Sequence, residues 1–106
     1  MTVKASEDGV LLVSGDDIPK VAFALSSPTR FKILKLLKER EFMDIDELSK
    51  EVGRSKANIS TQIKILEDAK LIETRYTQGK RGVKKLCSTR IKEIRIIIPS
   101  SGSDGE

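Results

Sequence analysis

The spacing of hydrophobic residues divides the chain into short helical and extended segments. Val10–Val13 is an apolar run that ends at a Ser-Gly-Asp turn, which is typical of an edge strand. A first helix is expected to begin near Asp17. A second helix is expected from Pro28, because Ser27 can cap its first turn and proline favours the first helical position.

The second helix alternates apolar residues with cations. Its apolar residues recur at three- and four-residue spacings, which predicts that they form one wide stripe facing the core: Phe31, Ile33, Leu34, Leu36 and Leu37. The intervening lysines are expected to form a solvated face. This helix is therefore interpreted as a scaffold element.

A third, short helix is indicated by the sequence Asp44-Ile-Asp-Glu47, which has the arrangement of a capping box. This helix is expected to bury Ile45, Leu48 and Val52 and to end at Gly53, with Met43 and Leu48 closing over its first turn. The acids in this region could suggest a metal or acid-base cluster: Glu39, Glu41, Asp44, Asp46 and Glu47. Helix capping and the helix dipole explain several of them, so catalysis is not expected here.

A fourth helix is expected over residues 55–69, with Ser55 as its cap. Ile59, Ile63 and Leu66 are spaced for one buried face. Rotation by about 100° per residue predicts that a polar set points away from that face, with Lys56 and Ser60 at its margins: Ala57, Asn58, Thr61 and Lys64. Short side chains allow close approach to a major groove, and Asn and Lys can reach base edges.

A β-hairpin is predicted to follow the fourth helix. Residues 73–77 and 83–87 have the alternating pattern of strands, and residues 78–82 form a glycine-containing turn with Lys80 and Arg81 at its tip. A cation-tipped hairpin directly after a polar-faced helix is the second component of a winged helix.

A further strand is expected near the C-terminus, and both ends of the chain are expected to lie outside the folded domain. Residues 90–99 contain Ile94, Ile96, Ile97 and Ile98, a β-branched run that favours a strand. Because an exposed run of this kind would promote aggregation, it is predicted to pair with Val10–Val13 or with its counterpart in a second subunit. Residues 1–9 are expected to be flexible and residues 100–106 to be a disordered tail, so the folded domain is assigned to residues 10–99.

Composition narrows the chemistry that the chain can perform. Its 106 residues suffice for one domain, and they include no histidine and one cysteine, Cys87. A disulfide framework is excluded, and hydrolytic triads and zinc sites are nearly excluded, so we expect neither an enzyme nor a metal or other cofactor. No apolar run approaches the roughly 18 residues of a membrane span and no signal-peptide pattern opens the chain, so we expect a cytoplasmic protein without membrane contact.

Charge is distributed unevenly along the chain. Residues 1–50 contain 8 Lys and Arg against 9 Asp and Glu, whereas residues 54–95 contain 12 against 4. This asymmetry favours a polyanionic partner on one half of the fold, although a solvated basic surface would show the same excess.

The sequence resembles the ArsR-type winged helix-turn-helix regulators of prokaryotes over roughly residues 17–90. Three stretches carry the likeness: Ala24–Leu37, Ile45–Glu73 and Gly79–Leu86. Lys70 stands where the family often has glycine, which is a mild departure. The resemblance implies an α+β fold, mainly α, with a three-helix core, an additional N-terminal helix, a β-hairpin wing and extra terminal strands.

The same resemblance implies binding of double-stranded DNA, with the fourth helix in the major groove and the wing on the neighbouring groove or its phosphates. Carried over by position, the principal contacts of the helix would be Lys56, Ala57, Ser60 and Thr61. Further contacts are expected from Ser55, Asn58, Gln62, Lys64, Lys80, Arg81 and Lys84. Family members are usually homodimers on pseudo-palindromic operators, so a homodimeric repressor is expected here. Metal sensing is not expected to transfer, because the metal-sensing members use paired Cys, His or carboxylate ligands, whereas this chain has no histidine and its one cysteine, Cys87, lies in a predicted wing strand. No effector is indicated.

Two other classes of function remain open at this stage. A winged helix can serve as a protein-assembly module, although such modules have an apolar or acidic recognition face and this one is polar and basic. An architectural or RNA-binding role shares the electrostatics. Only Phe42 and Tyr76 supply aromatic rings beyond Phe31, which leaves little capacity for stacking on single-stranded bases.

Overall fold

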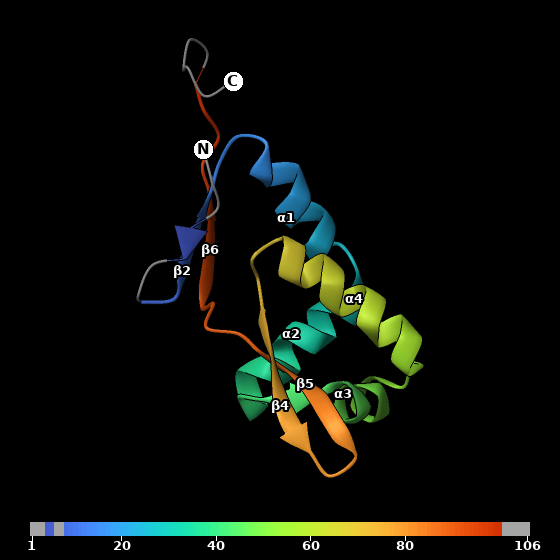
Figure 1. The fold of residues 1–106 in the computed structure, drawn as a ribbon. Helices are drawn as coiled ribbons and strands as arrows, with labels where there is room; N and C mark the ends of the chain where they lie inside the picture. The colour runs from blue at the N-terminus through green and yellow to red at the C-terminus, as the bar shows by residue number, and fades with distance from the viewer. Residues whose placement is uncertain (1–3, 6–7, 101–106) are drawn as a thin grey trace.

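The computed structural model describes residues 4–5 and 8–100 and contains helices and two small sheets (Figure 1). The elements, in chain order, are β1 Lys4–Ala5, β2 Val10–Val13, α1 Asp17–Leu25, α2 Pro28–Arg40, β3 Met43–Asp44, α3 Ile45–Val52, α4 Lys56–Asp68, β4 Glu73–Gly79, β5 Gly82–Ser88 and β6 Glu93–Ile96. This is the mainly α, α+β winged helix-turn-helix arrangement that the sequence predicts. Among the described residues, none of the helices has the length and apolar character needed to cross a bilayer.

Local capping signals place the helix starts where the sequence predicts them. The Ser27 hydroxyl accepts a hydrogen bond of 3.2 Å from the backbone N–H of Arg30, with Pro28 opening α2. At α3 the Asp44 carboxylate accepts from the Glu47 N–H at 2.8 Å, and the Glu47 carboxylate accepts from the Asp44 N–H at 2.9 Å. The capping box is therefore confirmed.

Helix α4 is one residue shorter at each end than the predicted 55–69, because Ser55 and Ala69 are its caps. The Ser55 hydroxyl accepts a 3.1 Å hydrogen bond from the Asn58 N–H. Ile59, Ile63 and Leu66 are fully buried, as their spacing predicts.

The core lies between the helices and reaches both sheets. Its largest fully buried side chains come from β2, from all four helices, and from the wing sheet and the segments beside it: Leu11, Val13, Val21, Ile33, Leu37, Met43, Leu48, Ile59, Ile63, Leu66, Leu71 and Cys87. Val21 and Ala24 supply the buried face of α1. Ile45 and Val52 of α3 are only half-buried, although both pack against this cluster as predicted.

The predicted stripe on α2 is wrong at one position. Phe31 is 51% exposed, whereas Ile33, Leu34 and Leu37 are buried. At about 100° per residue, Phe31 lies roughly 115° from the centre of the face that these three residues define. Arg30 lies near the centre of that face and is buried, although the sequence pattern predicted that Phe31 would be buried there.

Arg30 is a buried charged residue, and each of the three nitrogens of its guanidinium donates a hydrogen bond. Nε donates to the Ala24 carbonyl at 2.9 Å and Nη2 to the Phe23 carbonyl at 2.9 Å. Nη1 donates to Gln62 Oε1 at 2.7 Å. A buried charge is tolerable when it is hydrogen-bonded in this way, and here it joins the end of α1 to α4 through α2.

The wing is a longer and better-supported hairpin than the sequence predicts. Strands β4 and β5 pair in antiparallel register out to Gly79 and Gly82, so only Lys80 and Arg81 remain in the turn. The two-residue strand β3 pairs with β5, with Met43 opposite Cys87 and Asp44 opposite Leu86. This third strand, which was not predicted, attaches the wing to the start of α3.

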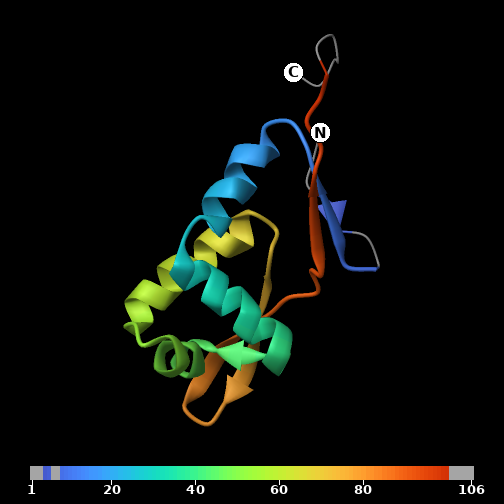
Figure 2. The same ribbon diagram turned by 180° about the vertical axis from the view of Figure 1, so that it is seen from behind.

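The second sheet has the order β1-β2-β6 and stands beside α1, at the end of the molecule away from the wing tip (Figures 1 and 2). β6 runs parallel to β2, with Val10 beside Glu93 and Val13 beside Ile96, which confirms the intrachain alternative for residues 90–99. β1 lies in the segment expected to be flexible, yet it pairs with β2. The rest of that expectation, and that of a disordered tail, falls on residues 1–3, 6–7 and 101–106, which lie outside the described residues.

Two non-glycine residues adopt a positive φ. Lys70 has φ 65° just after α4, which is the conformation that glycine provides without strain. This conformation accounts for the glycine that ArsR-type sequences often have at this position, and Lys70 adopts it at a cost in strain. Glu41 has φ 70° and ψ −58°, and the Phe42 N–H donates to the Arg40 carbonyl at 2.8 Å, which makes a strained three-residue turn between α2 and β3.

Candidate nucleic-acid interface

Helix α4 shows a continuous polar face to solvent. Its exposed residues are Lys56, Ala57, Ser60, Thr61, Lys64 and Asp68, and the Lys64 ammonium lies 3.6 Å from Asp68 Oδ1. Asn58 and Gln62, expected on the same face, are half-buried. Apart from Asp68 at the end of the helix, the exposed residues are small or end in a hydroxyl or ammonium group, so the groove of a nucleic acid could approach the helix backbone closely.

The turn before α4 sets the direction of this face. Helix α3 ends at Gly53, which has φ 79°, a left-handed conformation suited to glycine. Ser55 then caps α4 two residues later. The compact Gly53–Ser55 connection holds the two helices as a helix-turn-helix pair, with Leu48 and Ile59 buried between the elements.

The wing carries cations to the same end of the molecule. A groove lies between the wing and the starts of α3 and α4, and its charged lining is Asp44, Asp46, Lys56, Lys80, Arg81, Lys84 and Lys85. Lys56 of α4 therefore borders the same hollow as Lys80 and Arg81, which lie far away in the sequence. Lys85 was not among the predicted site residues, although its place beside Lys84 in a basic strand is a usable signal.

Two carboxylates in this groove hold two of its lysines. The Lys56 ammonium lies 3.1 Å from Asp46 Oδ1, and the Lys84 ammonium lies 3.2 Å from Asp44 Oδ2. Lys80 and Arg81 make no hydrogen bond or ion pair with any described residue. The turn thus presents two cations whose charge is not neutralised by the described part of the chain.

Asp44 lies where the groove, the helix cap and the wing sheet meet. Its partial burial raises the pKa of the carboxyl, but hydrogen bonds from the Glu47 backbone and from Lys84, together with the Lys84 charge, lower it by more. The net pKa lies below the ordinary value of 3.8, so Asp44 is ionised at neutral pH. It fixes Lys84 while it caps α3.

Asn58 and Gln62 are held from below by the buried arginine. Gln62 Oε1 accepts the 2.7 Å hydrogen bond from Arg30, which leaves its amide nitrogen to face outward, 3.5 Å from Asn58 Oδ1. This chain of contacts sets the side-chain orientation at two of the predicted site residues. Thr61 differs, because its hydroxyl donates back to the Ala57 carbonyl of the same helix at 3.2 Å.

Cys87 lies in β5, and its burial raises the pKa of the thiol to about 11. It is therefore a protonated, packed side chain at neutral pH and behaves as a small hydrophobic residue. Among the described residues, no three side chains of Cys, Asp or Glu gather as a set of metal ligands.

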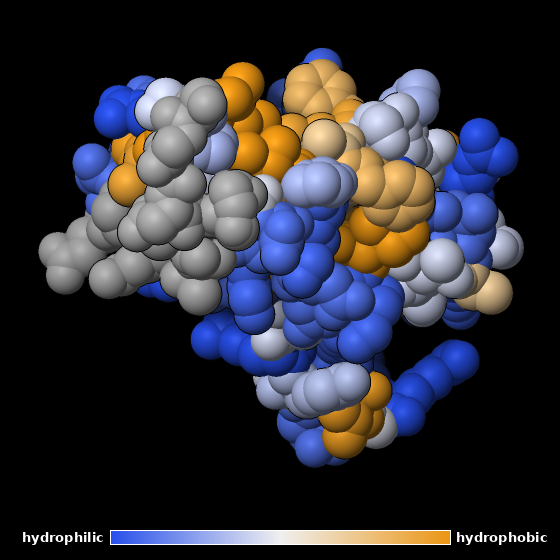
Figure 3. Space-filling view, turned by 90° about the horizontal axis from the view of Figure 1, so that it is seen from above, coloured by the Kyte–Doolittle hydropathy of each residue, from blue (hydrophilic) through white to orange (hydrophobic). Residues whose placement is uncertain are grey.

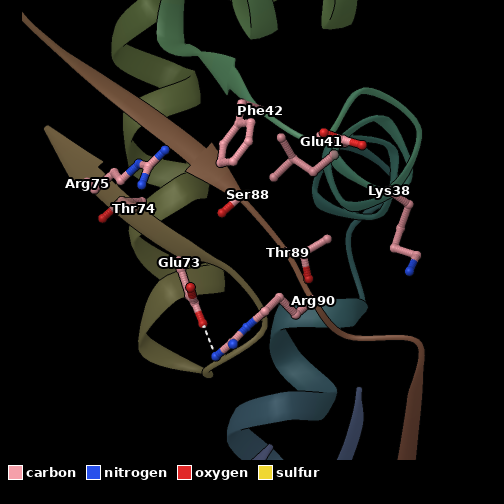
Figure 4. A pocket seen from close by; sticks show the side chains of 10 residues that line it. Lys38, Glu41, Phe42, Glu73, Thr74, Arg75, Ser88, Thr89 and Arg90 are labelled. Atoms are coloured by element: carbon pink, nitrogen blue, oxygen red, sulfur yellow. Dashed lines mark hydrogen bonds and ion pairs between the residues drawn. The ribbon is translucent and has the colours of Figure 1, made fainter. Parts of the chain in front are cut away.

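A second hollow of different character lies at the base of the wing (Figure 4). The Arg75 guanidinium lies 5.0 Å from the centre of the Phe42 ring, and Arg90 bridges to Glu73 at 3.0 Å across its lower part. The Thr89 hydroxyl donates to the Leu71 carbonyl at 2.7 Å. These contacts tie the end of the wing to the segment that leads to β6.

A helix, a tight turn, a second helix with an open polar face and a cation-tipped hairpin together define a winged helix-turn-helix domain. Residues 27–74 match the family model described as bacterial regulatory protein, arsR family. This part of the chain is therefore similar to the ArsR-family domain. A search of curated protein sequences found no match to the chain.

Solved structures of regulators share this fold. The ArsR family transcriptional regulator RHA00566 is 26% identical, with 70% of this chain and 71% of that chain covered and a TM-score of 0.59. Rv0081 of M. tuberculosis is 29% identical, with 68% of each chain covered and a TM-score of 0.58. Mb0332 of Mycobacterium bovis, described as a homodimeric winged helix-turn-helix DNA-binding domain, is 21% identical, with 71% and 65% covered and a TM-score of 0.61. The fold is therefore one that solved structures of transcriptional regulators share.

Proposed function

We propose that residues 10–99 bind double-stranded DNA in a sequence-specific way and act as a homodimeric transcriptional repressor. Helix α4 enters the major groove with Lys56, Ala57, Ser60, Thr61 and Lys64 toward the bases and phosphates. Ser55, Asn58 and Gln62 support this face, and Lys80, Arg81 and Lys84 contact the adjacent backbone.

One observation carries the proposal: the exposed face of α4 and the unpaired cations of the wing turn border a common groove, with Lys56 on one side and Lys80 and Arg81 on the other. A duplex offers phosphates on both sides of a major groove, so a recognition helix flanked by cations fits it. The charge excess of residues 54–95 has the sign that this requires.

Dimerisation is proposed from symmetry and from a neighbour. A single helix reads only a few base pairs, and two copies on a two-fold axis double the site that is read. Mb0332, which shares the fold, is described as a homodimer. No small-molecule effector is assigned.

Selection of bound duplexes from a random library, followed by titration of the enriched sequence, tests the proposal. The expected result is a pseudo-palindromic consensus bound at least about 10³-fold more tightly than scrambled duplex. The logarithm of the affinity should fall steeply with the logarithm of salt concentration.

Two results would contradict it. A library that enriches no consensus while binding remains strong would indicate an architectural protein. A protein that shifts no duplex even at low salt, but is captured with another protein after nuclease treatment, would indicate an assembly module.

A further inference from the structure

One edge of the β1-β2-β6 sheet is open. Within the described residues β6 pairs on one side with β2 and has no strand on the other. The Glu93 and Ile97 N–H groups donate to β2 at Gly9 and Val13. Because successive residues of a strand point their backbone groups in opposite directions, Ile94, Ile96 and Ile98 direct theirs toward the open edge.

The last part of this edge is apolar, although Glu93 and Arg95 earlier in the strand are charged and form an ion pair at 3.1 Å. Ile96, Ile97 and Ile98 are 45%, 51% and 81% exposed. Natural proteins commonly protect open edges with charge, proline or a covering element, so three consecutive exposed isoleucines mark this part of the edge as a pairing site. Pro99 limits this edge, since it has no N–H to donate.

An apolar hollow continues from β6 onto α2. Its apolar lining is Ile91 and Ile94 on one side and Leu25, Phe31 and Leu34 on the other, and Lys35, Lys38 and Lys92 complete its wall. Phe31 is half-exposed at its border, with the Lys35 ammonium 5.7 Å from the centre of its ring. Figure 3 looks down on the end of the molecule that carries α1 and this sheet and shows hydrophobic side chains gathered there.

We infer that the occupant of this edge is the β6 strand of a second copy of the chain, paired antiparallel. The inference rests on the proposed function, of which it specifies the dimer. A two-fold axis perpendicular to the sheet joins the two edges into one sheet and places both helical bodies on the same side of it.

The residues at the edge select the register. A crossing at Arg95 would place the two Arg95 side chains opposite each other, which is unfavourable. A crossing at Ile94 would place Ile96 opposite Lys92. A crossing at Ile96 pairs Ile96 with itself and Ile94 with Ile98 of the second copy, so all three outward-facing residues meet apolar partners.

The experiment uses the full chain and compares substitutions on the two faces of the same sheet. Ile96→Pro removes a backbone N–H that faces the open edge and leaves the bonds to β2 in place. Ile96→Lys adds a charge there. Leu12→Lys is the matched control, because Leu12 is also 45% exposed and lies on the opposite face of the sheet, on β2. Circular dichroism and thermal unfolding confirm that each variant is folded.

Sedimentation equilibrium should give a dimer for the wild type and for Leu12→Lys. Both Ile96 variants should raise the dimer dissociation constant at least about tenfold, toward monomer. Ile96→Cys should form a disulfide-linked dimer on oxidation, whereas Leu12→Cys should not. The buried Cys87 is common to both.

Dimeric Ile96→Pro and Ile96→Lys proteins, or equal cross-linking of both cysteine variants, would overturn this interface while leaving a dimer by another surface intact. A monomeric wild type would overturn the interface and the proposed dimer together. Titration with a duplex that contains one half-site tests DNA binding separately from dimerisation. Folded Ile96 variants should bind a half-site as tightly as the wild type does, but should not bind the full site more tightly than the half-site.

A wild-type protein that is dimeric but does not bind a half-site would contradict the proposed DNA contacts and would leave the proposed interface intact.

Discussion

Arg30 of α2 and Gln62 of α4 are joined by a 2.7 Å hydrogen bond between Nη1 and Oε1. The bond links a buried cation to the side of the helix that is proposed to read DNA. It fixes one end of the Gln62 amide and, through it, the neighbourhood of Asn58. The orientation of this part of α4 thus depends on a residue far from the exposed face.

Substitution of Arg30 should therefore destabilise the whole domain. Arg30→Ala removes the side-chain donor to the Ala24 carbonyl and the partner of Gln62 Oε1, and it opens space in the core, so the free energy of unfolding should fall by about 2–3 kcal/mol. Urea denaturation measures this. Arg40→Ala is the control, because its ion pair with Glu51 is half-exposed and should contribute less than about 1 kcal/mol. Equal losses in both variants would show that the buried network is not special.

Substitutions on the exposed face of α4 should change sequence preference. Asn58→Ala and Thr61→Ala should relax preference at individual base pairs by about 1–3 kcal/mol, because base-edge contacts carry sequence information. Selection of bound duplexes with each variant measures this. An unchanged consensus in both variants would remove these residues from base readout.

The wing cations should contribute by charge alone. Lys80→Ala and Arg81→Ala should weaken all duplexes alike, and each should reduce the salt slope of log affinity by about one. Fluorescence titrations at several salt concentrations measure the slope. Lys32→Ala is the control, since Lys32 is exposed on α2 and outside the groove. A salt slope that is reduced in Lys32→Ala but unchanged in Lys80→Ala and Arg81→Ala would contradict the proposed orientation of the domain on DNA.

Acid should weaken the domain partly through Asp44. Its folded pKa is lowered below 3.8, so its stabilising contribution is present above that value and is lost as the pH falls through the folded pKa. Asp44→Asn keeps a capping side chain but loses the ion pair with Lys84. Its stability should therefore change less than that of the wild type between about pH 4 and pH 2, as measured by denaturant midpoints. Parallel curves would show that Asp44 does not couple to folding.

Lys70 stores strain that glycine would release. Lys70→Gly should raise the free energy of unfolding by about 0.5–1 kcal/mol, because φ 65° costs a residue with a Cβ and costs glycine little. Thermal unfolding measures the gain. Lys64→Gly is the control, because glycine in the interior of α4 should instead lower the free energy of unfolding by a similar amount.

Local chemistry explains what could be predicted from the sequence. Ser27, the Asp44–Glu47 pair and Ser55 each satisfy the orphan N–H groups of a helix within three residues, so the helix starts are visible in the sequence. The polar face of α4 follows from Ile59, Ile63 and Leu66 by periodicity. The wing follows from alternation and its two glycines.

Long-range pairing explains what could not be predicted. The burial of Arg30 depends on carbonyls of α1 and an amide of α4, and periodicity of apolar residues instead assigned its place to Phe31. β1 and β3 have two residues each, too few for a pattern, and exist only because a partner strand is present. The common groove of Lys56, Lys80 and Lys85 likewise follows from the tertiary arrangement.

The pairing of β3 with β5 has a consequence for how the domain could meet its ligand. Because the strand that leads directly into α3 is also a strand of the wing, the hairpin and the helix-turn-helix cannot swing independently. A duplex would meet a preassembled surface that loses little internal freedom on contact. Adjustment of fit then falls mainly to the nucleic acid, so flexible base steps should improve an operator even at positions that no side chain reaches.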